Sequence, residues 1–130
     1  NSFTGTAQTL ELLGNHIYGF SGSVDTPSTQ SATVDLLNFN TGNYYTVCTL
    51  QPYYDNIDQG DNVKFNISIG GSLVYSVQLS GSTTANVHRG DVQPIPLIIP
   101  SYTKITVTGA NEADDDARAV GIILIGRIYR

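Results

Sequence analysis

The stretch "VKFNISIGGSLVYSVQL", residues 63–79, alternates apolar and polar side chains on both sides of a glycine pair. Alternation with a period of two predicts strands with one buried face, and a glycine pair between two such runs predicts a β-hairpin. The place where the chain turns decides which side chains share a face. A slip of one residue would move a strand's whole apolar set to the other side.

Two loop lengths give different registers for this hairpin. A two-residue Gly-Gly loop would place Ile67 opposite Val74 and would mix apolar and polar residues on one face. A three-residue loop that ends at Ser72 gathers the apolar residues on a single dry face, and we predict that register. Its cross-strand pairs are Ile69 with Leu73, Ile67 with Tyr75, Phe65 with Val77 and Val63 with Leu79.

The whole chain has the composition of an all-β protein. Only 13% of its 130 residues are charged, and Gly, Ser, Thr and Asn separate short runs of Val, Ile, Leu and Tyr. We predict a single domain over residues 1–130, an antiparallel β-sandwich of jelly-roll type with about eight strands and an amino-terminal arm over residues 1–14. The predicted strands are His16–Ser21, Ala32–Phe39, Tyr44–Tyr53, Val63–Ile69, Leu73–Ser80, Val92–Ile99, Thr103–Gly109 and Ala119–Tyr129.

Charge and cysteine content exclude several classes of protein. The net charge of −5 and the pI of about 4.6 argue against nucleic-acid binding, which requires a basic patch. No apolar run approaches the roughly 18 residues of a membrane span, so we expect no membrane contact. Cys48 is the single cysteine, and we expect no disulfide, metal or cofactor. The sequence has no Met, so we expect a trimmed chain or a preceding lead segment.

Three side chains have the chemistry for nucleophilic or proton-transfer work near neutral pH, namely His16, His88 and Cys48. None of them lies in a nucleophile or metalloprotease motif. We therefore predict no catalytic residue and expect that the protein is not an enzyme. We expect His16 to start a strand, Cys48 to fill a core position and His88 to lie in a loop.

Two acidic segments raise the question of calcium binding. The loop Tyr53–Asn62 has three aspartates, but Ile57 and Gln59 stand where the EF-hand pattern needs oxygen ligands. Glu112 and the contiguous residues 114–116 form an acidic cluster, and such clusters usually lie in solvent. We expect a hydrogen-bonded turn in the first segment and a solvated loop in the second.

Two segments are apolar at successive positions. "GIILIG", residues 121–126, needs cover on both faces of its strand. "PIPLIIP", residues 94–100, has the same need, and its prolines confine it to a sheet edge or an irregular strand. The core covers one face only, and an exposed apolar strand is an aggregation site. We predict self-association and an interface at Ile123, Ile125, Arg127, Tyr129, Arg130, Leu97 and Ile99. A second subunit, the amino-terminal arm or a capsid partner would cover the exposed face of the last strand.

Eight tyrosines suit either a sugar site or a subunit interface. Adjacent strand residues point to opposite faces, so the 44–45 and 53–54 doublets each offer one ring outward. The chain has no Trp, the residue most suggestive of a sugar platform. We favour the interface. The alternative is a carbohydrate-binding module that uses Tyr44, Tyr53, Tyr54 and the aspartates of the following loop.

Three segments carry a family resemblance: "LLNFNTGNYYTV", "PLIIPSYTKITVTGAN" and "GIILIGRIYR". Over residues 33–130 the chain resembles the small jelly-roll surface proteins of viral capsids, especially the decoration or cement proteins of phages. The resemblance implies a non-enzymatic structural role at the virion surface. It also implies self-association as a trimer or pentamer and docking on a major capsid protein or another virion component. A receptor-binding spike is a further alternative, although the chain lacks a repeat or a coiled-coil shaft.

Overall fold

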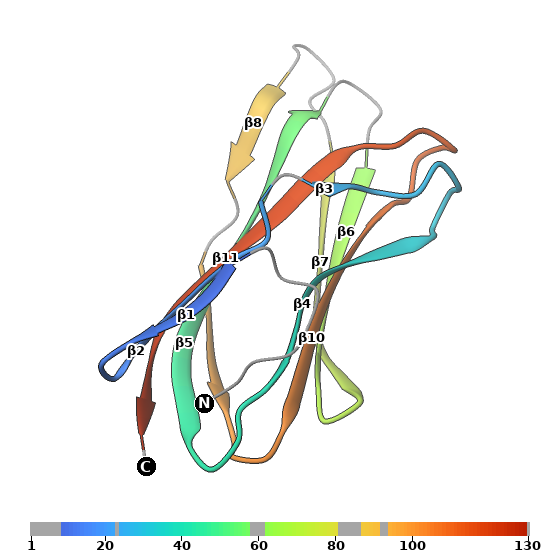
Figure 1. Cartoon of the computed structure of the whole chain (residues 1–130). Helices are drawn as coiled ribbons and strands as arrows, with labels where there is room; N and C mark the ends of the chain where they lie inside the picture. The colour runs from blue at the N-terminus through green and yellow to red at the C-terminus, as the bar shows by residue number, and fades with distance from the viewer. Residues whose placement is uncertain (1–8, 23, 58–61, 81–86, 92–93, 130) are drawn as a thin grey trace.

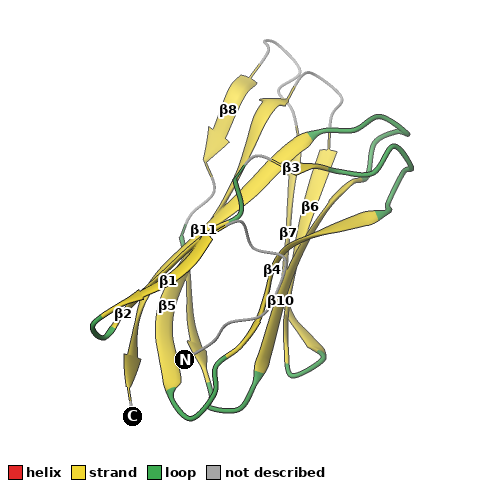
Figure 2. Ribbon diagram, viewed as in Figure 1, coloured by secondary structure: helices red, strands yellow, loops and turns green. Residues whose placement is uncertain are grey.

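The computed structural model describes residues 9–22, 24–57, 62–80, 87–91 and 94–129. In these ranges the chain forms two antiparallel sheets, one of seven strands and one of four. Figure 2 shows strands and loops only, with no helix in the described part of the chain. The prediction of an all-β sandwich is confirmed.

The larger sheet has the order β1-β2-β11-β5-β8, with β3 beside the start of β11 and β9 beside the first half of β5. Figure 1 shows β11 running the length of this layer between β2 and β5. The strands are β1 (Thr9–Leu13), β2 (His16–Phe20), β3 (Val24–Asp25), β5 (Tyr45–Ile57), β8 (Val87–Asp91), β9 (Ile95–Ile99) and β11 (Ala119–Tyr129).

The smaller sheet has the order β4-β10-β6-β7. Its strands are β4 (Thr33–Asn40), β6 (Asn62–Ile69), β7 (Ser72–Ser80) and β10 (Lys104–Asn111). All eight predicted strands overlap an observed one; of the segment predicted as Val92–Ile99, Ile95–Ile99 is a strand and residues 92–93 lie outside the described residues. Pro96 lies within β9, which among the described strands pairs with β5 alone, as expected of an edge strand.

The strands pair in a nested order. β6 pairs with β7, β5 with β8 and β9, β4 with β10, and β2 with β11. The chain is therefore a long antiparallel ribbon whose tip is the β6–β7 hairpin, and successive pairs lie in alternate sheets. Two further pairings, β10 with β6 and β11 with β5, join the turns of the ribbon into the two sheets.

Three strands were missed by the sequence prediction. Residues 9–13 were assigned to an arm, but they form β1, which pairs with β2 along its whole length. The two-residue β3 is too short to leave a periodic pattern. β8 contains His88, which was predicted to lie in a loop, so that prediction was wrong. The remainder of the predicted arm, residues 1–8, lies outside the described residues.

The β6–β7 hairpin has the predicted register in its body but a different turn. Ile67 lies opposite Tyr75, and the pairs toward the open end follow the prediction. At the turn, Ile69 lies opposite Ser72, so the loop is the two-residue Gly-Gly loop that we had rejected. One extra residue, Val74, forms a β-bulge that restores the apolar register. The prediction failed because it placed that extra residue in the loop.

The core lies between the two sheets. Alternate residues of β2, β5, β6, β10 and β11 point inward, and a bulge in β4 between the partners of Val107 and Thr108 lets both Leu36 and Leu37 be buried. The largest fully buried side chains are Phe39, Phe65, Ile17, Leu36, Leu37, Leu50, Ile67, Ile99, Ile105, Ile122 and Leu124. No helix long and apolar enough to cross a membrane occurs among the residues described.

Candidate functional site: the outer face of the seven-stranded sheet

The last strand, β11, is apolar on both of its sides. Ile122, Leu124 and Ile128 are buried in the core. The alternate residues point away from the core, and Ile125 keeps 55% of its surface exposed. The predicted division of this strand into two faces is therefore confirmed, and its second face is not covered by the described part of the chain.

Neighbouring strands extend this exposed surface. Tyr18 of β2 and Thr49 of β5 flank Ile125, while Phe20 lies opposite Ile123. Further out, Val47 lies opposite Ile98 of β9, which is 66% exposed. We call this surface the apolar face. It consists of Leu13, Tyr18, Phe20, Tyr45, Val47, Ile98, Ile123, Ile125 and Tyr129.

The aromatic rings on the apolar face stack on one another. Tyr45 and Tyr129 are cross-strand neighbours with ring centroids 5.2 Å apart and planes 18° apart. At this separation and angle the two rings form an offset stack. Each therefore has one ring face taken up by the other. A sugar platform presents ring faces to the ligand, so this pair favours a protein contact over a sugar contact.

Of the residues predicted for a sugar site, Tyr44 and Tyr53 have side chains that the structure describes, and these two do not form a platform. Tyr44 is buried, which agrees with the prediction that the 44–45 doublet presents only one ring outward. Tyr53 is half-buried and stacks with Phe20, with ring centroids 6.3 Å apart. The side chains of residues 54–57 and the whole of residues 58–61 lie outside what the structure describes.

A shallow hollow lies at the centre of the apolar face. Its volume is about 230 Å³, and its walls are Tyr18, Phe20, Ile123 and Ile125, with Gly19 and Leu124 at its base. Its base is backbone, because Gly19 pairs with Leu124 and position 19, like the Leu124 side chain, faces the core. The hollow exceeds the roughly 150 Å³ of an engineered apolar cavity that binds benzene, so one aliphatic or aromatic side chain can enter it.

The outer face of the four-stranded sheet has the opposite character. Its cross-strand rows are polar, and Ser76 donates a hydrogen bond of 2.8 Å to Asn66 within one of them. Leu73 and Val74 are exposed apolar residues of this sheet, both near the hairpin turn. The polar residues of this face are Asp35, Asn38, Lys64, Asn66, Ser68, Ser76, Gln78, Lys104, Thr106 and Thr108.

The structure places four of the seven predicted interface residues on one surface. Ile123, Ile125, Arg127 and Tyr129 all point outward from β11. Arg127 lies near Tyr129, with 6.0 Å between the guanidinium carbon and the ring centroid. Arg130 lies outside the described residues.

Leu97 and Ile99, the two interface residues predicted in β9, face the core rather than the outer side of the sheet. Ile99 is completely buried and Leu97 packs against the core, so Ile99 is not available to a partner. Pro96 and Ile98 are the exposed residues of that strand. The sequence could not show which residues of this strand face outward, because the strand is apolar at successive positions. Only its register against β5 distinguishes the outer residues from the inner ones. The contributions of Tyr18 and Val47 were also missed, since strands distant in sequence supply them.

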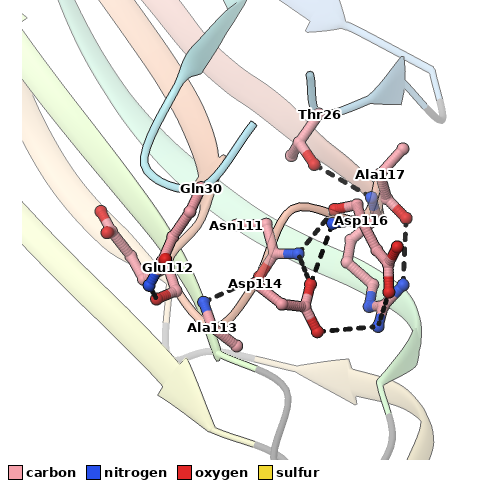
Figure 3. Close-up of polar contacts among 9 residues, drawn as sticks. Thr26, Gln30, Asn111, Glu112, Ala113, Asp114, Asp116 and Ala117 are labelled. Carbon is pink, nitrogen blue, oxygen red and sulfur yellow. Dashed lines mark hydrogen bonds and ion pairs between the residues drawn. The ribbon is translucent and has the colours of Figure 1, made fainter. Parts of the chain in front are cut away.

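The acidic loop between β10 and β11 is held together internally (Figure 3). Asn111 is buried and its amide donates to Asp114 Oδ1 at 2.7 Å and to the Asp116 carbonyl at 2.6 Å. Asn111 Oδ1 accepts a bond of 3.0 Å from the Ala113 amide. Arg118 forms ion pairs with Asp114 and Asp116, at 3.7 and 3.8 Å.

Asp114 is the best-bonded carboxylate in this loop. The Asp116 amide and the Asn111 side chain donate to it, and these bonds, with the charge of Arg118, lower its pKa below the ordinary 3.8. Asp115 accepts from the Gln30 amide at 2.8 Å, which ties the loop to the β3–β4 connection. Asp115 and Asp116 are exposed, as expected of a solvated loop, and both carboxylates also have partners within the chain.

No cluster of three or more His, Cys, Asp or Glu side chains that could hold a metal ion occurs among the described residues. His16 starts β2, as predicted, and its side chain is exposed. Cys48 is a core residue, as predicted, and burial raises the pKa of its thiol to about 12. A thiol so protonated is a poor nucleophile at neutral pH.

Comparison with known proteins does not identify a family for this chain. No protein-family model matches the chain, and no curated protein matches it significantly. The apolar face is therefore the feature from which a function has to be argued.

Proposed function

We propose that this protein is a non-enzymatic structural component of a virion surface, which stabilises the shell by burying its apolar face against other protein. Its mechanism is binding without turnover. Association removes the aliphatic and aromatic side chains of the apolar face from water, and this is the main favourable term in most protein association.

The contrast between the two broad faces of the sandwich carries this proposal. A sheet with one face on the core and the other in water normally has a polar outer face, as the four-stranded sheet does. The seven-stranded sheet instead exposes aliphatic and aromatic residues from five adjacent strands. Apolar patches of this extent mark interaction sites, and stacked tyrosines suit an interface because each has a large ring and a polar end.

The nested strand order supports a jelly-roll fold as part of this proposal. A jelly roll is a double sheet of eight main strands that contains two Greek keys. Here four nested pairs alternate between the sheets, with β8 and β9 together serving as one strand opposite β5. The resemblance to capsid decoration proteins supports the virion setting. A trimer or pentamer docked on a major capsid protein is the arrangement that the resemblance implies.

Particles purified from the source of this sequence test the proposal. We expect mass spectrometry to find the chain in a fixed ratio to the main shell protein. Electron cryomicroscopy should show a β-sandwich on the outer surface with Ile125 in a contact. A chain that stays in the soluble fraction, or that sits on the particle with its apolar face toward solvent, contradicts the proposal.

The competing function is a carbohydrate-binding module or a receptor-binding spike, and the observation in its favour is the number of aromatic rings on one face. A glycan array, run with calcium and with chelator, separates it from the structural role. Specific sugar binding that is lost in a Tyr18→Ala variant would favour this alternative. We expect no specific binding, because the Tyr45 and Tyr129 rings stack on each other.

A further inference from the structure

We propose that the apolar face packs against the same face of a second copy of this chain, around a two-fold axis close to Ile125. The inference rests on the proposed function only in that the apolar face serves assembly. It adds which molecule covers the apolar face, namely a second copy of the chain. Flat sheets pack face to face about 10 Å apart with interdigitating side chains, so a second sheet of the same kind is a suitable cover.

The size of the apolar face is the size that a dimer needs. It spans five neighbouring strands and the length of β11 from Ile123 to Tyr129. Strands about 4.8 Å apart and residues about 3.4 Å apart give a projected area of roughly 500 Å². Two copies together would bury at least about 1,000 Å², which is where specific interfaces begin.

The shape of the apolar face is self-complementary. Ile125 stands beside the central hollow and on the central strand of the sheet. In a two-fold contact centred there, the Ile125 side chain of each copy can enter the hollow of the other. The hollow is bounded by Tyr18 and Phe20, so the entering side chain would be surrounded by apolar atoms.

The charges also suit a contact between identical faces. Between the rows of Ile123 and Tyr129, the charged side chains that the structure describes on this face are Glu11 and Arg127. One acid and one base on the same surface can pair reciprocally across a two-fold axis. The 112–116 loop precedes β11, so its carboxylates lie beyond the Ile123 end of the apolar face.

A two-fold contact fits this surface better than a three- or five-fold ring. A ring needs a heterologous contact, in which the apolar face meets a different surface of the next copy. The other broad face is polar in the described residues, and its exposed apolar side chains Leu73 and Val74 lie at one end. The same face on a second copy is the one described surface that matches in both size and character.

The first test is the molar mass of the purified chain between about 1 and 100 μM, by light scattering and sedimentation. We expect a dimer, and we expect Ile125→Glu to raise its dissociation constant at least about 100-fold, because two unpaired carboxylates would be buried at its centre. Val74→Glu is the matched control, since Val74 is 50% exposed but lies in the other sheet. It should leave the dimer intact, and circular dichroism should show both variants folded.

A cysteine pair tests the position of the axis. Cys48→Ala removes the single native cysteine, and Ile125→Cys in that background should form a disulfide between copies within minutes of mild oxidation. Gln78→Cys, on the exposed polar face of β7, should not. A wild type that stays monomeric at 100 μM, a trimer or pentamer, or a Gln78→Cys variant that cross-links as fast as Ile125→Cys would overturn the inference. None of these results bears on whether particles carry the chain.

Discussion

Single residues on the inner side of β11 decide how closely the strands of the larger sheet approach. Gly126 is paired with Cys48, and a β-carbon added to it would lie 2.5 Å from Cys48 Cβ and 2.6 Å from the carbonyl oxygen of Val47. Both contacts are far below van der Waals distance. The glycines that bracket "GIILIG" therefore have a packing role, while the four apolar residues between them fill the core and the apolar face.

We predict that Gly126→Ala destabilises the fold by about 2–3 kcal/mol, as expected of overpacking against backbone that cannot move aside. Chemical denaturation measures this loss. The Cys48→Ala/Gly126→Ala double variant should be no more stable, because Cβ of residue 48 and the Val47 carbonyl remain in place. Wild-type stability in the single variant would show that the two strands can separate without cost.

Cys48 gives a second prediction at this scale. Its thiol is buried and its pKa is raised to about 12, so almost none of it is thiolate at pH 8. Iodoacetamide should leave the folded protein unmodified at pH 8 over an hour and should modify it completely in denaturant. Equal rates in the two states, followed by mass spectrometry, would place the thiol at the surface.

Among the elements, the β6–β7 hairpin shows how two glycines and a bulge set a register. Gly70 and Gly71 have φ of 62° and 86°, the values of a type I′ turn, which residues with a β-carbon adopt at a cost. The bulge at Val74 then brings Tyr75, Val77 and Leu79 to the inner side. Because β7 is an edge strand, Tyr75 remains 43% exposed there. The face of the hairpin that was predicted to be buried is therefore only partly buried.

Gly71→Val should therefore destabilise the protein by about 2 kcal/mol, since a β-branched residue is strained at positive φ. Gly71→Asn is the control, and it should lose much less, because asparagine tolerates this conformation. Thermal unfolding compares the two. Equal melting temperatures for both variants would mean that the turn relaxes to another type.

The acidic loop is an element held by one side chain. Asn111→Ala removes three hydrogen bonds within the loop and should cost about 2 kcal/mol at pH 7. Asp115→Asn keeps an acceptor for the Gln30 amide and should change stability little. The pKa of Asp114 is lowered in the folded state, so its carboxylate stabilises the fold above pH 3.8. This stabilisation is lost as the pH falls through the lower pKa that Asp114 has in the folded protein. A loss in Asn111→Ala no larger than in Asp115→Asn would contradict this role.

Local pattern accounts for much of the fold but for little of the candidate site. Alternation located eight strands and divided β11 correctly between core and surface, because a strand's two faces are written in its own residues. The pairing of strands that are distant in sequence cannot be read from the residues of either strand alone. Ile98 and Tyr18 join the apolar face only through the register of β9 on β5 and of β2 on β11. The Val74 bulge likewise depends on burial of Phe65 and Ile67, which no turn sequence specifies.

The whole molecule has one polar and one apolar broad face, and the account depends on the apolar one being covered in the working state. Tyrosines report on this directly. Tyr18, Tyr45 and Tyr129 lie on the apolar face, whereas Tyr102 is 78% exposed in the loop between β9 and β10. A single labelling reaction therefore contains its own control.

Hydroxyl-radical footprinting of the chain at 1 μM and at 100 μM is the most direct measurement. If the apolar face is buried against a second copy, Tyr18, Tyr45 and Tyr129 should become several-fold less reactive at the higher concentration, while Tyr102 stays unchanged. Ile125→Glu should abolish this protection. Equal reactivity of all four tyrosines at both concentrations would contradict the account, because the apolar face would then remain open to water.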